Sequence, residues 1–405
     1  MFKLLQGLRV VEASAFVAAP LAGLTLSQLG AEVIRVDTVG GGPDFHRWPV
    51  DSAGRSLYWA GLNKGKRSVA LDLRSAEGRE LLLALATAPG ASAGLVVTNF
   101  PVRSFLSYES LRARRADVVV ARVQGDADGG NAVDYTVNCA LGYPAITGPE
   151  GHDGPVNHVL PAWDLITGVQ AALGLVVAHR HREATGEGQE VRVALSDVGF
   201  AVAGHLGQIA ETELGGVDRP RVGNHIFGTF GRDFATADGR RLMIVAITDR
   251  QWQGLVQATG LAEPIAAIER ALGLDFRREG DRYQARKTIA GLVESWCEAR
   301  PYAEVAAALE TAGACFGPYR TLREALTSDP RLSEANPIFS RVTHPDIGTH
   351  LTPGSPMHFS GAERITPEPA PRLGQDTRAV LEEVLGLGAA EVDALHARGV
   401  AATPR

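Results

Sequence analysis

The sequence predicts an α/β protein with a large domain built on a parallel sheet and a smaller α+β domain. Over the first half of the chain, short apolar stretches alternate with helix-periodic ones, a pattern typical of a parallel sheet covered by helices on both faces. The alternating pattern ends at Gly215–Asn224, a stretch that contains several Gly and a Pro. A length of 405 residues allows two or three domains. We therefore expect a large domain in residues 1–215, a small one in 220–335, and a segment, 340–405, that returns to the large domain.

The first half contains six stretches that we expect to be strands. In chain order they are Leu8–Glu12, Ala31–Val36, Ser68–Leu73, Gly94–Thr98, Asp117–Val123 and Val191–Leu195. Between them, Pro20–Leu29 is predicted to be a helix with Pro in its first turn, and Ser75–Ala86 a helix that Ser75 caps. A longer apolar, helix-periodic run follows Asp164 and ends at the Gly-rich turn Thr185–Gln189. Ligands of parallel sheets bind beyond the carboxyl ends of the strands, so we expect the site there.

The second half has a different pattern. Thr229–Val245 is predicted to be a hairpin that turns at Asp238–Gly239. Helical pieces continue to about Leu326, and a stretch rich in Pro and Gly, Asn336–Pro371, leads to a final helix near Thr377–Leu385. This part of the chain is therefore expected to hold the small domain and the returning segment.

Composition excludes several classes of protein. A formal charge of −6 argues against a general binder of nucleic acid or of an anionic membrane. The apolar run Ala171–Ala178 is far shorter than the ~20 residues of a membrane helix, and the N-terminus has no signal-peptide pattern. The three cysteines, Cys139, Cys297 and Cys315, are widely spaced and suit a reducing compartment without a metal cluster. We expect a soluble cytoplasmic enzyme with no metal and no nucleic-acid or membrane partner.

Asp164 stands directly before the long helix-periodic run, which begins at Leu165. One interpretation is an N-cap, because Asp is favoured there. The other is a nucleophile: amides at a helix start favour an anion and would keep an acid with an ordinary pKa of about 3.9 ionised. A carboxylate that attacks a thioester forms a mixed anhydride, which divides one difficult step into easier ones. The residues by themselves leave both interpretations open.

A basic stretch, Asn63–Arg74, places four cations within twelve residues beside the expected ligand edge. It suits phosphate binding and, equally, a solvated strand end. The run Gly40–Gly42 could let a backbone approach a nucleotide, or could be a plain loop. No G-x-G-x-x-G follows the first strand, so a dinucleotide-dependent dehydrogenase is not expected.

Two further polar stretches allow both a purely structural and a functional interpretation. Val133–Asn138 brings an acid, a phenol and an amide together, which turn or cap chemistry also explains. Phe227–Phe234 offers Arg232 as a cation for a substrate carboxylate, or as one partner of a surface ion pair.

Many blocks of the chain, taken in order, resemble the class III coenzyme A transferases, the formyl-CoA and carnitine-CoA transferase family. The resemblance covers nearly the whole length. Its blocks are Gly7–Glu12, Ala18–Pro20, Leu29–Asp37, Leu62–Leu73, Thr98–Phe100, Asp164, Thr185–Gln189, Gly223–His225 and Thr236–Gly239. The resemblance implies a large Rossmann-like domain, a small domain, and a homodimer whose two chains are interlinked like rings.

The resemblance also implies roles for individual residues. Asp164 matches the nucleophilic aspartate of the family. The residues that match its CoA-holding segments are Val17, Ala18, Arg35, Leu71, Arg74, Asn99 and Phe100. The expected substrate pocket comprises Val133, Asp134, Trp163, Arg47 and Arg232. Where relatives carry an Arg eight residues after the Asn, this chain has Ser107, so that phosphate contact is not expected here. No cofactor beyond the CoA part of the substrate and no metal are implied.

Within the family, stretches such as Val156–Asp164 and Gly40–Val50 resemble members that move CoA between the two carboxyl groups of one methylfumarate molecule. The expected reaction is the conversion of 2-methylfumaryl-CoA to 3-methylfumaryl-CoA. Trp163 and the insert 227–234 are expected to form a wall that retains the free diacid. Arg47, Lys64 and Arg232 are the candidate cations for its free carboxylate.

Three alternatives stay open. The first is an intermolecular CoA-transferase that uses separate donor and acceptor acids. The second is an α-methylacyl-CoA racemase, which needs a base beside the thioester; racemases of the family carry His where this chain has Val133, which cannot act as one. The third is a CoA-binding protein without catalysis, in which Asp164 only caps a helix.

Overall fold

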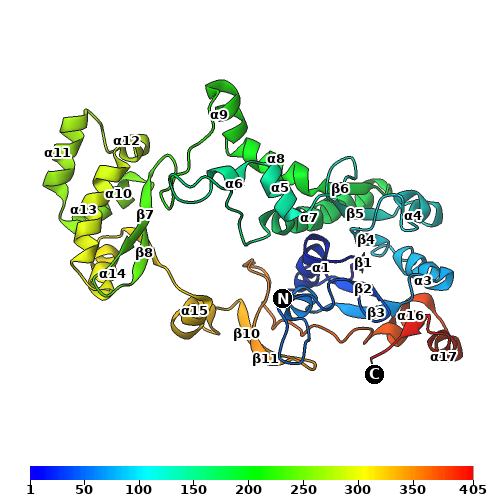
Figure 1. Ribbon diagram of the computed structural model, residues 1–405. Helices are drawn as coiled ribbons and strands as arrows, with labels where there is room; N and C mark the ends of the chain where they lie inside the picture. Colours follow the sequence, from blue (N-terminus) through cyan, green and yellow to red (C-terminus); the bar gives the residue numbers. More distant parts are fainter. Residues whose placement is uncertain (405) are drawn as a thin grey trace. The chain divides into compact units, whose positions relative to one another are not determined.

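The computed structural model describes residues 1–404 and divides into two compact units (Figure 1). The large unit contains residues 1–141, 158–215 and 330–404, and the small unit contains 142–157 and 216–329. The C-terminal segment thus belongs to the large unit. Nothing in the sequence pattern indicated that residues 142–157 belong with the small unit.

The large unit is built on a mostly parallel seven-stranded sheet, as the sequence pattern predicts. Its strands are β1 (Arg9–Ala13), β2 (Glu32–Thr38), β3 (Arg67–Leu71), β4 (Leu95–Thr98), β5 (Val119–Gln124), β6 (Glu190–Ala194) and β12 (Ala401–Ala402). The strand order is β12-β3-β2-β1-β4-β5-β6, and every neighbouring pair is parallel except β12 with β3. The order reverses between β1 and β4, and that switch point is where ligands of such sheets bind.

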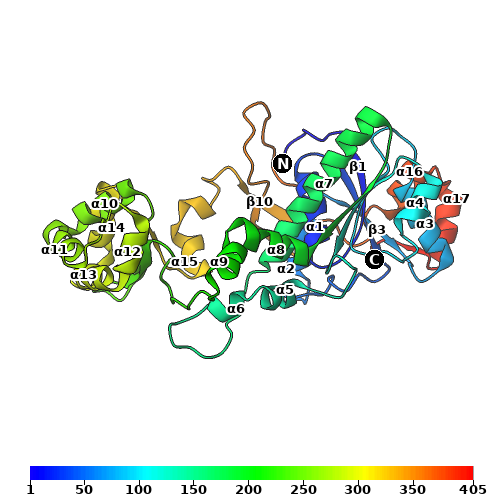
Figure 2. The same cartoon turned by 90° about the horizontal axis from the view of Figure 1, so that it is seen from above.

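Helices cover both faces of this sheet, which explains why strands such as β4 are apolar and buried throughout. The helices of the large unit are α1 (Ala18–Gln28), α2 (Leu57–Leu62), α3 (Ala76–Ala86), α4 (Tyr108–Arg114), α5 (Asp134–Ala140), α7 (Ala162–Thr185), α8 (Leu195–His205), α9 (Gln208–Gly215), α16 (Thr377–Leu385) and α17 (Ala389–Ala397). In Figure 2, α1 and α7 lie on one side of β1, and α3, α4, α16 and α17 lie on the other.

Helices α1 and α7 approach closely because Gly168 has no side chain. A Cβ at Gly168 would lie 2.6 Å from the backbone oxygen of Ala18. The contact brings the start of α1 to the first turns of α7, which carry Asp164. A small residue at this position therefore decides how near the two helices come.

Helix α7 begins two residues before Asp164, so the prediction of Asp164 as its N-cap is wrong. The N-cap is Pro161, whose side chain makes no capping hydrogen bond, and Asp164 is the third helical residue. The helix ends at Gly186, whose positive φ of 78° suits glycine. At 24 residues α7 is long and apolar enough to cross a membrane by length and composition only, a test that core helices of soluble proteins also pass.

The small unit contains a three-stranded antiparallel sheet packed against helices. Its elements are β7 (Phe230–Ala235), β8 (Arg241–Ala246), β9 (Cys315–Pro318), α6 (Tyr143–Ile146), α10 (Asp249–Thr259), α11 (Ala262–Leu272), α12 (Glu279–Gln284), α13 (Arg286–Glu298), α14 (Tyr302–Thr311) and α15 (Leu322–Ser328). The pairing of β7 with β8 confirms the predicted hairpin, and Gly239 at its turn has a φ of 74°. The core includes Phe230, Phe234, Trp252 and Ile289.

The segment that returns to the large unit contains a hairpin that the sequence pattern did not predict. A short 3-10 helix (Pro330–Leu332) precedes β10 (Phe339–His344), which pairs with β11 (Gly348–Pro353). The predicted final helix matches α16, and β12 then adds to the edge of the main sheet at β3. A strand of two alanines carries no periodic signal, so sequence alone could not reveal it.

Candidate active site

A cavity of about 450 Å³ lies at the switch point of the large unit's sheet. It is lined by residues that follow three neighbouring strands, together with the starts of α5 and α7. The lining comprises residues 15–18 after β1, Asn99 after β4, 123–125 and 130–135 around the end of β5, and Arg47, Asp164 and Leu195. Of the residues expected at the site, seven therefore meet here: Val17, Ala18, Arg47, Asn99, Val133, Asp134 and Asp164.

Asp164 is half-buried in this cavity, and its pKa is raised from 3.8 to about 6. Burial is the main cause, the nearby Asp134 raises the pKa further, and Arg47 acts in the opposite direction. Burial and a second carboxylate therefore outweigh the effect of the helix start on the pKa of Asp164. Asp164 is an acid that ionises near pH 6, and above that pH it is a desolvated carboxylate facing a cavity.

Asp134, which is 1% exposed, supplies the cap that α7 lacks. Its Oδ2 accepts hydrogen bonds from the backbone N–H of Trp163 at 2.7 Å and of Asp164 at 3.1 Å. Its Oδ1 lies 3.0 Å from Nε2 of His158. Since Asp134 already occupies these two amides, they are not available as donors to a reacting oxyanion.

The amides at the start of α1 have no such partner. Val17 is the N-cap of α1 and makes no side-chain cap, and within residues 1–404 neither its backbone N–H nor that of Ala18 donates to another group of the protein. Both residues line the cavity. The amides of a helix start are good donors to anions, so this is where an oxyanion or a carboxylate can be held.

Arg47 is the only cation among the described residues that line the cavity. Its guanidinium lies 5.5 Å from the ring centre of Phe16 and 5.2 Å from that of Tyr58. These two aromatic faces restrict the side chain by cation–π contact. Arg47 also lowers the pKa of Asp164, so its charge acts on the same small volume.

The loop that ends β1 is held in a strained shape at the cavity. Phe16 has a φ of 71°, which is rare for a residue with a large side chain. Its N–H donates to Asp44 Oδ2 at 3.1 Å. The side chain of Asn99 accepts from the N–H of Ala15 at 3.1 Å and donates to the Ala15 oxygen at 2.9 Å. These two hydrogen bonds with Asn99 fix the position of the loop at the edge of the cavity.

Arg35, expected to hold CoA, is fully buried and does not line the cavity. Its Nε bonds Asp37 at 2.9 Å, Nη1 bonds Glu12 at 3.0 Å, and Nη2 bonds Asp44 at 3.1 Å. Glu12 also pairs with the buried Lys66 at 2.7 Å. The structure therefore gives Arg35 a structural role: through Asp44 it holds the loop of Phe16.

Three other residues expected at the CoA site do not line this cavity. Leu71 is completely buried in the core, and Phe100 packs against the same core. Arg74 lies in the turn after β3 with a side chain that is 91% exposed, and its Nε is 3.5 Å from Oδ1 of Asp72. Ser107, which stands where relatives carry Arg, caps α4 by accepting from the N–H of Ser110 at 3.1 Å.

Trp163, Arg232 and Lys64, which were expected at the substrate pocket, do not line this cavity either. Trp163 is 5% exposed, and its Nε1 donates to Asn138 at 3.3 Å, so its ring is not part of the cavity's lining. Arg232 belongs to the small unit, where it pairs with Glu294 at 3.2 Å. Lys64 donates to the backbone oxygen of Pro353 at 3.0 Å, and burial lowers its pKa to about 8.

Three residues at or beside the site had not been singled out in the sequence: Phe16, Tyr58 and His158. His158 lies in a stretch that carries the family resemblance, but its partner Asp134 is 24 positions away. Phe16 stands between two blocks of the family, and only its backbone angle distinguishes it. No local pattern in the sequence would have indicated these contacts.

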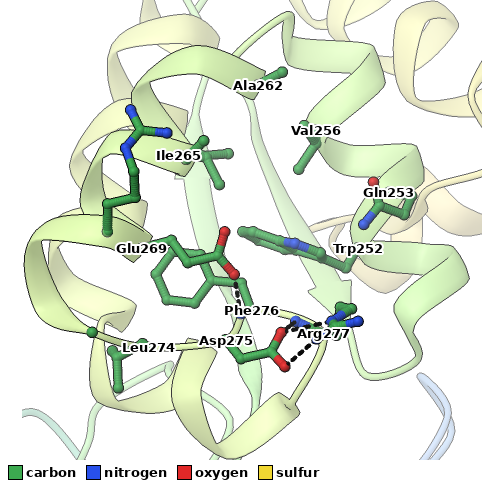
Figure 3. Close-up of a pocket in the computed structure, with 13 residues that line it drawn as sticks. Trp252, Gln253, Val256, Ala262, Ile265, Glu269, Leu274, Asp275, Phe276 and Arg277 are labelled. Atoms are coloured by element: carbon green, nitrogen blue, oxygen red, sulfur yellow. Dashed lines mark hydrogen bonds and ion pairs between the residues drawn. The ribbon is translucent and has the colours of Figure 1, made fainter.

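The small unit has cavities of its own. The one in Figure 3, of about 670 Å³, is floored by Trp252 and Phe276. Its two carboxylates already have partners: Glu269 accepts from the N–H of Phe276 at 2.7 Å, and Asp275 pairs with Arg277 at 2.8 Å. Although larger than the cavity at Asp164, it contains no residue that the sequence indicated. Among residues 1–404, no group of three or more His, Cys, Asp or Glu side chains could hold a metal ion.

The chain is similar to CoA-transferases along nearly its whole length. It matches the model of CoA-transferase family III over residues 5–377. It is 55% identical to 2-methylfumaryl-CoA isomerase of Chloroflexus aurantiacus over 402 residues, which cover 99% of this chain and 98% of that protein. It is 30% identical to succinate–glutarate CoA-transferase of Agrobacterium fabrum, with 94% of this chain and 95% of that protein covered.

Solved structures show the same fold. A crystal structure of a CaiB/BaiF family protein from Brucella suis matches with a TM-score of 0.77 at 26% identity, covering 95% of this chain and 100% of that one. The large parallel-sheet unit with a smaller second unit is therefore an arrangement that relatives share.

Proposed function

The chain belongs to CoA-transferase family III, and from that premise we propose that it converts 2-methylfumaryl-CoA to 3-methylfumaryl-CoA by moving CoA within one molecule. The observation that carries this reaction is the similarity to 2-methylfumaryl-CoA isomerase, which extends over 99% of the chain. The cavity supports it, because it contains one half-buried carboxylate and one cation. The ligand is an acyl-CoA, and the proposal needs no cofactor beyond it and no metal.

The first half of the reaction moves CoA from the substrate to the enzyme. The Asp164 carboxylate attacks the C1 thioester carbonyl, the carbon–sulfur bond breaks, and a mixed anhydride and CoA thiolate form. The thiolate then attacks the aspartyl carbonyl of the anhydride. Cleavage of the anhydride carbon–oxygen bond leaves an aspartyl-CoA thioester and the free 2-methylfumarate dianion.

The second half returns CoA to the other end of the same molecule. The C4 carboxylate attacks the aspartyl thioester carbonyl and expels the thiolate, which forms a second anhydride. The thiolate attacks the C4 carbonyl of this anhydride, giving 3-methylfumaryl-CoA and the original Asp164 carboxylate. No proton is gained or lost over the cycle, so Asp164 has only to be ionised at the start.

Two groups of the cavity suit the charges that this cycle creates. The backbone amides of Val17 and Ala18 can donate to the oxyanion of each tetrahedral intermediate, in place of the amides that Asp134 occupies. Arg47 can pair with whichever carboxylate of the diacid is free. Of the three candidate cations, only Arg47 borders the cavity that contains Asp164, which is why we choose it.

We propose that CoA contacts the enzyme along Val17, Ala18 and Asn99, which border the cavity. A CoA contact by Arg35 or Leu71 is not supported, since both side chains are buried. Arg74 is exposed in the turn after β3 and can reach a phosphate outside the cavity.

Retention of the free diacid distinguishes this reaction from ordinary CoA transfer. Phe16, Val133 and Tyr135 line the cavity and are themselves partly exposed. Together with Arg47 they can hold the diacid while it turns over, which keeps its second carboxylate close to the aspartyl thioester. We propose these residues as the retaining wall in place of Trp163.

Hydroxylamine trapping tests the covalent intermediate. Turnover of 2-methylfumaryl-CoA in hydroxylamine should convert Asp164 to its hydroxamate, which peptide mass spectrometry detects. The Asp164→Asn variant provides the control and should neither turn over nor be modified. Absence of the hydroxamate in an active wild-type enzyme would contradict the aspartyl intermediates.

Isotope-labelled free 2-methylfumarate distinguishes the intramolecular reaction from an intermolecular transferase. Little label should enter the product if the diacid is retained, and substantial incorporation would favour the intermolecular alternative. A racemase would instead exchange the α-proton of a saturated 2-methylacyl-CoA for solvent deuterium, which requires a base that Val133 does not offer.

We also propose a cytoplasmic homodimer of the interlinked kind that the family resemblance implies. One surface supports a subunit contact: Val169, Leu173 and Val177 follow one another every four residues along α7 and are 48%, 57% and 59% exposed. A stripe of this kind is a candidate protein interface. Light scattering of the purified protein tests the dimer, and a monomeric mass at micromolar concentration would contradict it.

A further inference from the structure

We propose that His158 is a positioning residue of this active site: it holds the carboxylate of Asp134, which caps α7 and thereby fixes the direction of Asp164. This inference rests on the proposed role of Asp164 as the nucleophile. It concerns a side chain that does not line the cavity and would not touch the substrate.

The need for such a residue follows from the start of α7. The first amides of a helix have no acceptors within it and require a cap. Here the N-cap is Pro161, whose side chain cannot serve, so the cap comes from Asp134, on another helix. One oxygen of Asp134 accepts from two successive amides, those of Trp163 and Asp164, at 2.7 and 3.1 Å. The orientation of the Asp134 carboxylate, which comes from another helix, thus affects the direction in which the side chain of Asp164 points.

His158 sets that orientation. Its Nε2 lies 3.0 Å from the other oxygen of Asp134, and because a carboxylate only accepts hydrogen bonds, Nε2 is the donor. Hydrogen bonds on both oxygens favour one orientation of the carboxylate about its Cβ–Cγ bond. The imidazole itself stands near two rings, with ring centres 5.9 Å from Tyr135 and 6.5 Å from Trp163.

The same contact affects the charge of Asp164. The groups that face Asp164 are Asp134 from α5, Arg47 from the loop after β2, and the phenol of Tyr58 from α2. Asp134 raises the pKa of Asp164, and Arg47 lowers it. A donor on the far oxygen of Asp134 draws negative charge away from Asp164. Loss of the His158 hydrogen bond should therefore make Asp164 harder to ionise.

The experiment compares His158→Gln with His158→Met in the full-length protein. Both side chains are flexible and similar in length, but only Gln can donate to Asp134. The His158 side chain is 27% exposed, so neither change leaves a large core cavity. We measure kcat, KM and the pH profile of kcat/KM for 2-methylfumaryl-CoA, and melting curves verify that each variant is folded.

The Met variant should lose on the order of 10- to 100-fold in kcat, the value of one hydrogen bond to a charged group. The acid limb of its pH profile of kcat/KM should move to higher pH, while KM changes little because His158 does not line the cavity. The Gln variant should retain kcat within several-fold and an acid limb close to that of the wild type. A Met variant that matches the Gln variant in kcat and in its acid limb would overturn the proposal.

Asp134→Asn gives an independent test if the Met variant does not fold. Asn keeps an oxygen for the two amides but removes the charge, so the acid limb should move to lower pH; an unchanged limb would overturn the link from Asp134 to Asp164. Failure of the proposed function has a different result. In that case the wild type would not turn over 2-methylfumaryl-CoA, or Asp164→Asn would remain active, whatever residue 158 is.

Discussion

Replacement of Asp164 by Asn should make the protein more stable and at the same time inactive. The pKa of Asp164 is raised from 3.8 to about 6, mainly because the ionised carboxylate is buried. An acid whose pKa is higher in the folded than in the unfolded state destabilises the fold when it ionises. This cost is absent below about pH 3.8, grows as the pH rises to 6, and is fully present above that pH.

The magnitude follows from the same values. At about 1.4 kcal/mol per pKa unit, the rise from 3.8 to about 6 corresponds to roughly 3 kcal/mol at pH 8. Asn also loses the attraction between an anion and the helix start, which is worth only about 0.3–1 kcal/mol. The gain is larger than the loss, so Asp164→Asn should stabilise the protein by about 2 kcal/mol at pH 8. At pH 4.5 the folded wild type is mostly protonated at Asp164, and the cost falls to about 1 kcal/mol, because this pH is only 0.7 unit above 3.8.

Thermal melting at the two pH values measures this difference. The melting temperature of Asp164→Asn should exceed that of the wild type by several degrees at pH 8 and by a clearly smaller amount at pH 4.5. Turnover should fall by at least ~1000-fold. Asp197→Asn, an exposed acid in the first turn of α8, is the control and should change the melting temperature little at either pH. An Asp164→Asn variant no more stable than the wild type at pH 8, or equally stabilised at both pH values, would refute the reasoning.

Three further substitutions test the site and its support. Arg47→Gln should lower kcat/KM about 10- to 100-fold, the value of one charged hydrogen bond, and should move the acid limb to higher pH because Arg47 lowers the pKa of Asp164; an unchanged profile would remove Arg47 from the site. Arg35→Met should lower the free energy of unfolding by about 3–5 kcal/mol in denaturant titrations, since three buried carboxylates each lose an ion-pair partner and Glu12 retains Lys66. A raised KM at wild-type stability would instead make Arg35 a CoA contact. Gly168→Ala should lower the melting temperature, at a cost of about 1–3 kcal/mol for overpacking, because its Cβ would meet backbone at 2.6 Å. Gly291→Ala, with open space around its Cβ, should be neutral or stabilising by up to ~1 kcal/mol, and equal effects of the two changes would contradict the packing argument.

Local patterns in the sequence were sufficient for much of the fold. Inner strands of the parallel sheet such as β4 are buried on both faces and so appear as short apolar runs, and Ser75 caps its helix as expected. The β7–β8 hairpin carries its own turn signal at Asp238–Gly239. Periodicity and caps concern neighbouring residues, and a single sequence displays them directly. The resemblance to a family added the role of Asp164 as the nucleophile and pointed to the residues that follow β1 and β4 as part of the site.

The tertiary structure alone decided how those residues are arranged. The cap of α7 comes from Asp134, about thirty positions before the helix, and so Asp164 is a raised-pKa acid inside the first turn and not an N-cap. Arg35 matched a CoA-binding position in sequence, yet three carboxylates surround it in the folded chain. The choice of Arg47 among three cations likewise needed the cavity. These contacts join residues far apart in the chain, because the reversal of strand order between β1 and β4 brings their loops together at one edge of the sheet. The sequence by itself determined which elements form and which acid to examine. The way these elements meet at the switch point determined the hydrogen-bond partners, the pKa and the neighbours of Asp164.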